Sequence, residues 1–176
     1  MRPVSDAFLL LMAEVSSALI GLFLVGVFFY AESGFRRGTP DRELMDAYFR
    51  AGTRIVLVLY TIPLALSLTL VALEPAWSRW LFALLSLALI AANVDSARRL
   101  RTSKKVIRST ALVVNEAVGT AAVVTLVILP WALGGFHPTR EDLTWAILLS
   151  FTSGFLSVCA LVLFVLDVAG IETRPE

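Results

Sequence analysis

The stretch Ala7 to Tyr30, AFLLLMAEVSSALIGLFLVGVFFY, constrains this chain more than any other. It is apolar enough and long enough to cross a bilayer as a helix, which takes about 20 residues. It also carries one carboxyl group, Glu14, where lipid offers no hydrogen-bond partner. No small-x-small cleavage pattern follows it, so we expect a retained transmembrane helix that needs protein around Glu14.

Four further apolar stretches have the length of membrane spans. Hydrophobic residues make up 58% of the 176 positions, against about 45–50% in soluble domains. We therefore expect one membrane domain over residues 1–176, all-α, built as a bundle of five transmembrane helices. The predicted spans are about 7–30, 55–73, 77–94, 111–133 and 143–166, with long connections at 31–54 and 95–110.

The connection 31–54 contains signals for a short amphipathic helix before the second span. Thr39 followed by Pro40 is typical of an N-cap and a first helical residue. Beyond it, apolar residues at helical spacing predict one stripe, formed by Leu44, Tyr48, Ala51 and Ile55. An interfacial helix and a solvated helical extension both fit this stripe. Within the second span, Pro63 frees a backbone carbonyl and predicts a bend between Leu59 and Pro63.

The basic residues are distributed unevenly between the two ends of the predicted spans. Twelve lie in the two long connections or in the tail, and three lie on the opposite side. Since Lys and Arg favour the cytoplasmic side, we expect a plasma membrane protein of bacterial type with cytoplasmic long connections, an outside N-terminus and a cytoplasmic C-terminus. Four tryptophans fall at the outer helix ends as interface anchors, namely Trp77, Trp80, Trp131 and Trp145.

The connection 95–110 holds the densest basic patch of the chain, which consists of Arg98, Arg99, Arg101, Lys104, Lys105 and Arg108. These side chains lie outside an apolar span, unlike voltage-sensor arginines. No aromatic platform accompanies them, so we do not expect nucleic-acid binding. A cytoplasmic anchor that attracts anionic lipid is the better interpretation.

Glu14 is predicted to lie at a level of the outer half that is rich in hydroxyl groups. The residues expected at this level are Ser17, Ser67, Ser86, Thr125, Ser150 and Ser153. No basic side chain reaches this level, and hydrocarbon favours the neutral form of a carboxyl group. We therefore expect Glu14 to donate to a hydroxyl or a backbone carbonyl. Ala13, Ser17 and Gly21 recur every four residues and predict a face for close helix packing.

A second polar level is predicted nearer the cytoplasm, about 10 Å from the first along the membrane normal. Its members are Asn93, Asp95, Asn115, Glu116 and Asp167, with Arg54 at the foot of the second span. Arg54 could neutralise Glu116, and Asp95 is expected to pair with Arg98 or Arg99 one helical turn later. Asn115 and Glu116 are adjacent, so at most one of them faces a common site.

The fifth span carries two pairs of small residues at four-residue spacing, Ser150 with Gly154 and Ser153 with Ser157. They predict another close-packing face, which could meet the first span. Cys159 is the only cysteine. It excludes an internal disulfide and is expected to be a small core residue.

The sequence offers few groups for catalysis or metal binding. His137 is the only histidine and lies in a turn marked by Gly134, Gly135 and Pro138. Without a second histidine or a nearby cysteine, we expect no metal site. No Gly-rich phosphate loop or nucleophile elbow is present. We therefore expect no cofactor and no enzymatic activity.

Two functions are compatible with this sequence. The first is an assembly or interaction subunit in the lipid bilayer, as a homo-oligomer or with another membrane protein, because small-residue faces are plentiful. The second is a proton or cation pathway with Glu14 and Ser17 at the outer level and Asn93, Asn115 and Glu116 at the inner one. The absence of catalytic machinery favours the assembly subunit.

Overall fold

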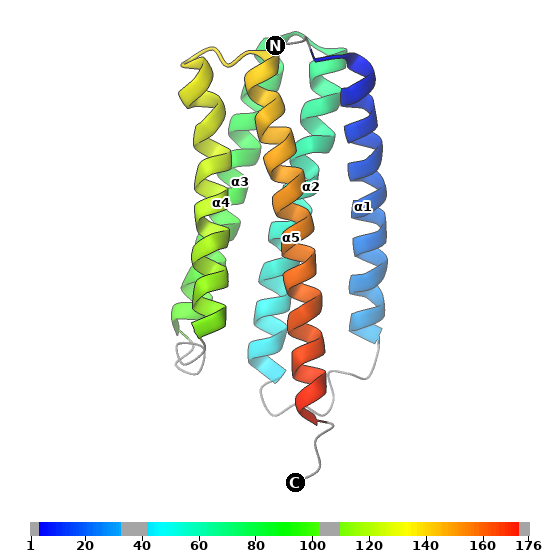
Figure 1. Ribbon diagram of the computed structural model, residues 1–176, viewed down its shortest axis with the longest axis vertical. Coiled ribbons are helices and arrows are strands. Elements are labelled where there is room, and N and C mark those ends of the chain that lie inside the picture. Colours follow the sequence, from blue (N-terminus) through cyan, green and yellow to red (C-terminus); the bar gives the residue numbers. More distant parts are fainter. Residues whose placement is uncertain (1–3, 33–41, 103–109, 173–176) are drawn as a thin grey trace.

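The computed structural model describes residues 4–32, 42–102 and 110–172, with side chains for 4–32, 49–98 except Pro75, and 117–163. Every regular element in these ranges is a helix (Figure 1). The helices are α1 (Asp6–Glu32), α2 (Arg42–Ala72), α3 (Pro75–Thr102), α4 (Thr110–Gly134) and α5 (Arg140–Glu172). All five contain a window long and apolar enough to cross a membrane. The predicted all-α bundle of five membrane helices is therefore confirmed.

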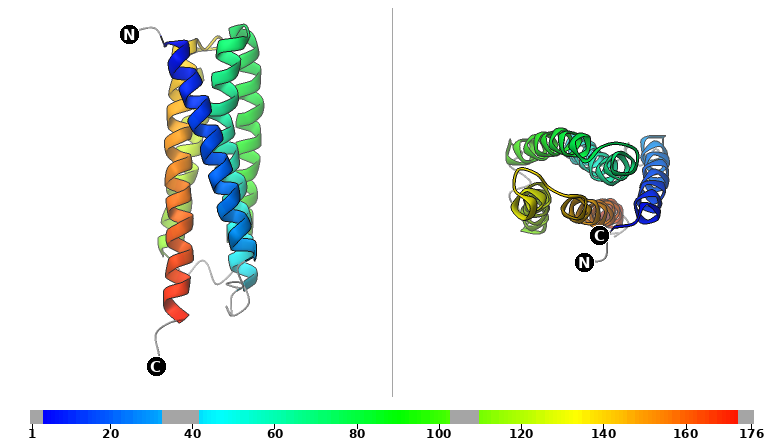
Figure 2. Two further views of the ribbon diagram at one scale, coloured as in Figure 1. Left: turned by 90° about the vertical axis from the view of Figure 1, so that its right-hand side faces the viewer. Right: turned by 90° about the horizontal axis from the view of Figure 1, so that it is seen from above.

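Four of the helices form a closed ring, and the first lies outside it. Helix α2 packs against α3 and α5, and α4 packs against α5 and more sparsely against α3. Helix α1 packs mainly on α2 (Figure 2). Because one neighbour covers only one side of a helix, most of α1 faces away from the protein.

Consecutive helices run antiparallel, so the helix ends gather at two ends of the bundle (Figure 1). The tryptophan end contains the starts of α1, α3 and α5 and carries all four tryptophans, Trp77, Trp80, Trp131 and Trp145. The basic end contains the starts of α2 and α4. It is named for the arginines and lysines in and beside the connection between α3 and α4.

The helices extend beyond the predicted spans at the basic end. The expected amphipathic segment and the second span form one continuous helix, α2, which begins at Arg42. Helix α3 continues past the predicted end at Val94 to Thr102, so much of the connection predicted at 95–110 is helical. Hydropathy marks only the part of a helix that suits lipid, whereas backbone hydrogen bonding continues into polar sequence. The predicted cap at Thr39 and Pro40 lies outside the described residues.

The contact between α2 and α5 is built from small residues opposite an aromatic ring. Gly154 is buried beneath Tyr60, and a Cβ atom at Gly154 would lie 3.0 Å from the ring. Phe151 meets the same ring edge to face, with 6.1 Å between the centroids. The predicted close packing at Gly154 is therefore found, but its partner is the second span and not the first.

The connection between α4 and α5 is a tight turn with a helix cap. Gly135 has φ of +59°, a conformation that favours glycine after a helix C-terminus. Thr139 caps α5, because its hydroxyl oxygen accepts from the Asp142 amide at 3.4 Å, and the Asp142 carboxylate in turn accepts from the Thr139 amide and hydroxyl, both at 2.8 Å. The Arg140 guanidinium also pairs with Asp6, which ties the start of α5 to that of α1.

Candidate functional site

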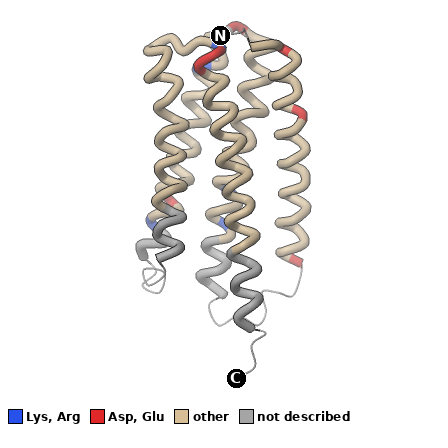
Figure 3. Tube along the Cα trace, in the orientation of Figure 1, with Lys and Arg blue, Asp and Glu red and all other residues tan. Residues whose placement is uncertain are grey.

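Glu14 lies on the surface of the bundle, on the side of α1 that faces away from the other helices. Its side chain is exposed, whereas Leu9, Met12 and Ser16 of the same helix are buried. At about 100° per residue, Glu14 is on the opposite side of α1 from these three. It lies about 12 Å along the helix from Asp6, within the predicted span. In Figure 3, α1 accordingly carries an acidic position, coloured red, between its two ends. The carboxyl group therefore points toward lipid or toward another protein.

The small residues of α1 do not form one face. Ala13 is 5% exposed and packs inward, whereas Ser17 and Gly21 are exposed. A step of four residues turns a helix by about 40° beyond a full turn, so two such steps move a position well around the helix. The predicted face is therefore divided between the contact with α2 and the outer surface.

The outer face of α1 instead contains a regular stripe that includes Glu14. Its exposed members recur at alternating steps of four and three residues, and we call them the α1 stripe: Leu10, Glu14, Ser17, Gly21, Leu24 and Phe28. This is the spacing at which one helix packs along another. Within the described residues, no atom outside the helix lies within 4 Å of a Cβ built on Gly21. The residues in the middle of the stripe are therefore small, and they leave room for a partner helix.

The hydroxyl groups predicted at the level of Glu14 face several directions. Ser67, Ser86 and Ser150 are buried among the helices. Ser17 and Thr125 are exposed, and the Thr125 hydroxyl donates to the carbonyl of Ala121 one turn earlier, at 2.9 Å. The Ser67 and Ser86 hydroxyls have no hydrogen-bond partner within the described part of the chain. These hydroxyls therefore do not form one polar site with Glu14, and sequence depth alone could not reveal this.

Ser150 has a specific role in the contact between α2 and α5. Its hydroxyl donates to the backbone carbonyl of Leu59 at 2.5 Å. This carbonyl would normally accept from the amide four residues later, but that residue is Pro63, which has no N–H. The sequence indicated a freed carbonyl and a small residue separately, and the fold brings the two together.

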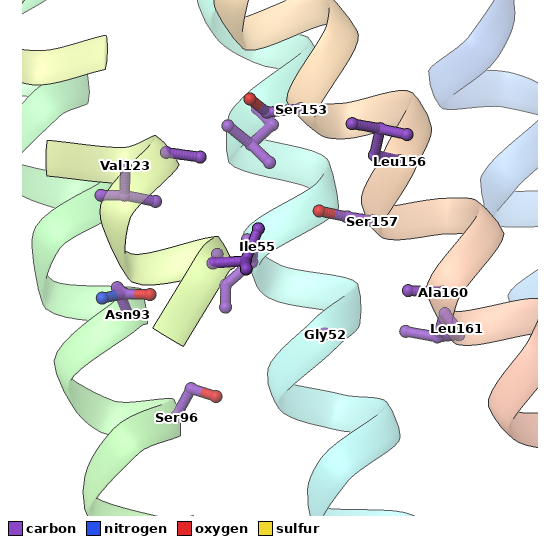
Figure 4. A pocket seen from close by; sticks show the side chains of 14 residues that line it. Gly52, Ile55, Asn93, Ser96, Val123, Ser153, Leu156, Ser157, Ala160 and Leu161 are labelled. Carbon is purple, nitrogen blue, oxygen red and sulfur yellow. The ribbon is translucent and has the colours of Figure 1, made fainter. Parts of the chain in front are cut away.

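A pocket of about 140 Å³ lies among α2, α3, α4 and α5, in the half of the bundle nearer the basic end (Figure 4). Ser153 and Ser157, predicted to pack closely on another helix, line this pocket. Asn93 also lines it, and its Nδ2 donates to the Thr120 hydroxyl at 3.3 Å. The sequence analysis missed this pocket, although small residues on its walls were a usable signal: Gly52, Gly119, Ala122 and Ala160.

The two predicted polar levels are not connected by this pocket. All of its lining residues belong to α2, α3, α4 and α5, whereas Glu14 lies on the outer side of α1. The side chains of Asn115, Glu116 and Asp167 lie outside the described part of the structure. The role of Asn115 and Glu116 in the predicted ion pathway therefore stays a prediction, as does the place of Asp167 at the inner polar level.

At the basic end, Arg54 forms an ion pair with Asp95 at 3.2 Å and so joins α2 to α3. The two side chains are 62% and 41% exposed, so solvent weakens their attraction. The predicted pair of Arg54 with Glu116 stays untested. Of the basic patch, Arg98 is exposed, and the other five residues have side chains outside the described set: Arg99, Arg101, Lys104, Lys105 and Arg108.

At the tryptophan end, three of the predicted anchors are exposed, namely Trp77, Trp80 and Trp145. Trp131 is half-buried and stacks on Phe82 of α3, with 6.3 Å between the centroids. His137 Nδ1 accepts from the Arg79 guanidinium at 2.5 Å. Among the described residues, no three His, Cys, Asp or Glu side chains cluster as metal ligands. Cys159 is half-buried in α5.

No protein-family model matches the chain, and neither a curated protein nor a solved structure is significantly similar to it.

Proposed function

We propose that this protein is a non-catalytic assembly subunit that associates with a second copy of itself through the α1 stripe. The observation that carries this proposal is the exposed position of Glu14 on a membrane-spanning helix. Lipid cannot satisfy a carboxyl group, so a side chain of this kind favours a protein partner over hydrocarbon. An edge helix that packs mainly on one neighbour has room for that partner.

A second copy suits this surface better than an unrelated helix. In a two-fold dimer whose axis lies along the membrane normal, each α1 stripe meets the same stripe of its partner. Glu14 then meets the partner subunit's Glu14. A neutral carboxyl group has both a donor and an acceptor, so the two groups can satisfy each other.

The rest of the stripe supports a close contact. Ser17 and Gly21 lie in the middle of the stripe and let two backbones approach. Leu10, Leu24 and Phe28 are 47%, 48% and 60% exposed. They flank the small residues and add van der Waals contact on both sides of the crossing. The contact thus combines close packing of the two helices with one polar pair, and both features drive helix association in lipid.

The test is self-association in a bilayer, measured by energy transfer between labelled copies at several protein-to-lipid ratios. We expect Glu14→Leu to weaken dimerisation about fivefold, which corresponds to about 1 kcal/mol for a hydrogen bond between helices in a membrane. Glu14→Gln should stay near wild type, because an amide also donates and accepts. Equal association of Glu14→Leu and wild type would contradict the role of Glu14.

The face itself is tested by cysteine cross-linking in a Cys159→Ser background. Ser17→Cys lies on the stripe, whereas Val15→Cys is exposed but about 160° away around α1. A short bifunctional reagent should join two copies at Ser17→Cys and not at Val15→Cys. Equal yields at both positions, or no dimer at either, would count against the proposal.

We further propose that the basic end faces the cytoplasm and the tryptophan end faces outside. The count of twelve basic residues against three supports this orientation. The exposed tryptophans at the opposite end suit the interface of the outer leaflet.

A further inference from the structure

The pocket among α2, α3, α4 and α5 lies where small residues meet and where α4 packs only sparsely against α3. Gly52 comes from α2, Gly119 and Ala122 from α4, and Ala160 from α5. Within the described residues, a Cβ atom built on Gly119 would meet no atom of another helix within 4 Å. The short side chains therefore leave about 140 Å³ of space in place of a close helix contact.

The helices contribute different chemistry to the walls of this pocket. The two lining residues of α3 are both polar, Asn93 and Ser96, whereas those of α2 and α4 are glycine or aliphatic. Helix α5 adds serine and aliphatic side chains. No described lining residue carries a charge. The pocket is therefore a largely apolar space with a polar wall on α3.

Ser96 is a buried polar group of this wall. It is 4% exposed, and its hydroxyl has no hydrogen-bond partner among the described residues. Figure 4 shows this hydroxyl turned inward from α3. Asn93 donates through Nδ2 to Thr120 at 3.3 Å, and its amide oxygen can still accept. An unpaired buried hydroxyl costs free energy, so this wall favours a guest that both donates and accepts.

The pocket opens sideways, between α4 and α5. Two of its lining residues, Val118 and Leu156, are 63% and 61% exposed on the surface of the bundle. Both belong to the parts of α4 and α5 that are apolar enough to lie in a membrane. A guest therefore enters from the hydrocarbon of the bilayer.

The volume and the walls together select the guest. An apolar cavity of about 150 Å³ holds one benzene, so a molecule of about six carbons suits this space. A single water needs two to four polar partners and would leave the aliphatic walls uncovered. A carboxylate or an ammonium group would be buried without an opposite charge on the described walls. A small neutral molecule with one polar group satisfies all three conditions.

We propose that the pocket binds one small uncharged alcohol that is dissolved in the membrane. Its hydroxyl donates to the amide oxygen of Asn93 and accepts from the hydroxyl of Ser96. Its carbon chain packs against the aliphatic walls of α2 and α4 and leads toward the opening beside Val118 and Leu156. This site is separate from the α1 stripe, so it does not depend on dimerisation.

The experiment is photolabelling of the full chain in lipid vesicles with hexanol that carries a diazirine in its chain. After irradiation, mass spectrometry of peptides locates and counts the adducts. We expect adducts on the pocket walls of α4 and α5, and an excess of unmodified hexanol should remove most of them. Hexanoate should leave them unchanged, because the walls offer no positive charge. Adducts on the outer side of α1 should resist both competitors and provide an internal control.

Two neighbouring alanines of α4 test the place of the site. Ala122 lines the pocket, whereas Ala121 is exposed on the outer side of the helix. Ala122→Leu should fill the space and lower the labelling that hexanol displaces about tenfold, and Ala121→Leu should label like wild type. Ser157→Leu fills the same space from α5 and replaces Ala122→Leu if that variant does not fold.

Two buried serines of α3 test the polar wall. Ser96 lines the pocket, whereas Ser86 is equally buried, at 4% exposed, and does not. Ser96→Ala should lower labelling by the alcohol probe about fivefold, the value of one hydrogen bond, and Ser86→Ala should leave it unchanged. Hexane with the same diazirine should label wild type and Ser96→Ala equally.

Each outcome decides the proposal. Wild-type labelling that hexanol does not displace would overturn the site, and so would wild-type labelling of a folded Ala122→Leu or Ser157→Leu. Equal labelling of wild type and Ser96→Ala by the alcohol probe would overturn the assignment of an alcohol. Displacement by hexanoate as strong as by hexanol would overturn the preference for an uncharged guest.

Discussion

At the scale of single residues, Glu14 and Ser150 illustrate two opposite outcomes for a polar group in an apolar helix. The Ser150 hydroxyl is fully buried and donates to the carbonyl that Pro63 leaves unpaired. Glu14 faces away from the bundle. The serine therefore stabilises the fold of one chain, whereas the carboxyl group of Glu14 faces the surroundings of the bundle, where we propose a contact between chains.

The hydrogen bond from Ser150 to the carbonyl that Pro63 leaves unpaired leads to a prediction for stability. Ser150→Ala removes the donor for the Leu59 carbonyl and should lower the free energy of unfolding by about 1 kcal/mol, a typical value for such a bond. Pro63→Ala restores a backbone N–H that can bond to Leu59, so in that background Ser150→Ala should cost less than about half as much. Unfolding in mixed micelles measures both values.

Ser153→Ala is the control for this measurement. Ser153 lies in the same helix but faces the pocket, so its substitution should change the free energy of unfolding by less than about 0.5 kcal/mol. Equal losses for Ser150→Ala with and without Pro63 would show that the serine does not act through the freed carbonyl.

At the scale of helices, α1 and α5 differ in how much of their surface the protein covers. Helix α5 contacts two neighbours along its length and begins with a side-chain cap. Helix α1 contacts mainly α2 and is preceded by Ser5, whose hydroxyl accepts from the Phe8 amide at 3.2 Å. Helix α5 is therefore a central element of the fold, and α1 is the helix best placed to bind a partner.

The cap of α5 gives a prediction at this scale. Thr139→Ala removes the hydroxyl that shares hydrogen bonds with Asp142 and should lower the free energy of unfolding by about 1 kcal/mol. Thr139→Ser keeps the hydroxyl and should stay close to wild type. Amide exchange in the first turn of α5, measured by mass spectrometry, should be faster only in Thr139→Ala. Equal exchange in both variants would contradict this account of the cap.

At the scale of the whole molecule, the ring of α2 to α5 and the outlying α1 separate two surfaces. The pocket lies within the ring, and the α1 stripe lies on the far side of α1. The pocket and the α1 stripe can therefore be changed independently by substitution. This separation also means that Glu14 and the pocket do not form one path across the membrane within a single chain.

The proposed orientation predicts the accessibility of the two ends. In a Cys159→Ser background, Thr139→Cys at the tryptophan end should react with a membrane-impermeant maleimide on intact cells. Thr102→Cys, at the end of α3, should react only after the membrane is permeabilised. Labelling of Thr102→Cys from outside intact cells would reverse the orientation.

Several features of the fold could be predicted without coordinates. The five helices follow from the lengths of the apolar stretches, because a bilayer accepts only a segment that satisfies its own backbone hydrogen bonds. The turn at Gly135 follows from residue chemistry. The extension of α3 to Thr102 was missed, because hydropathy falls at the membrane surface while the helix continues.

The direction in which each side chain faces was decided only by the tertiary structure. In a helix of a soluble protein, polar residues mark the side that faces water. In a membrane helix, the side that faces lipid is as apolar as the side that faces the protein. The sequence therefore predicted how deep in the membrane Glu14 lies, but not that it lies on the outer side of α1. For the same reason it grouped Ala13 with Ser17 and Gly21, and could not separate Ser150 in a close contact from Ser153 beside a pocket. Apolar length determined the membrane spans, whereas the packing of α1 against α2 and of α5 against α2 and α4 determined which residues face outward and which line the pocket.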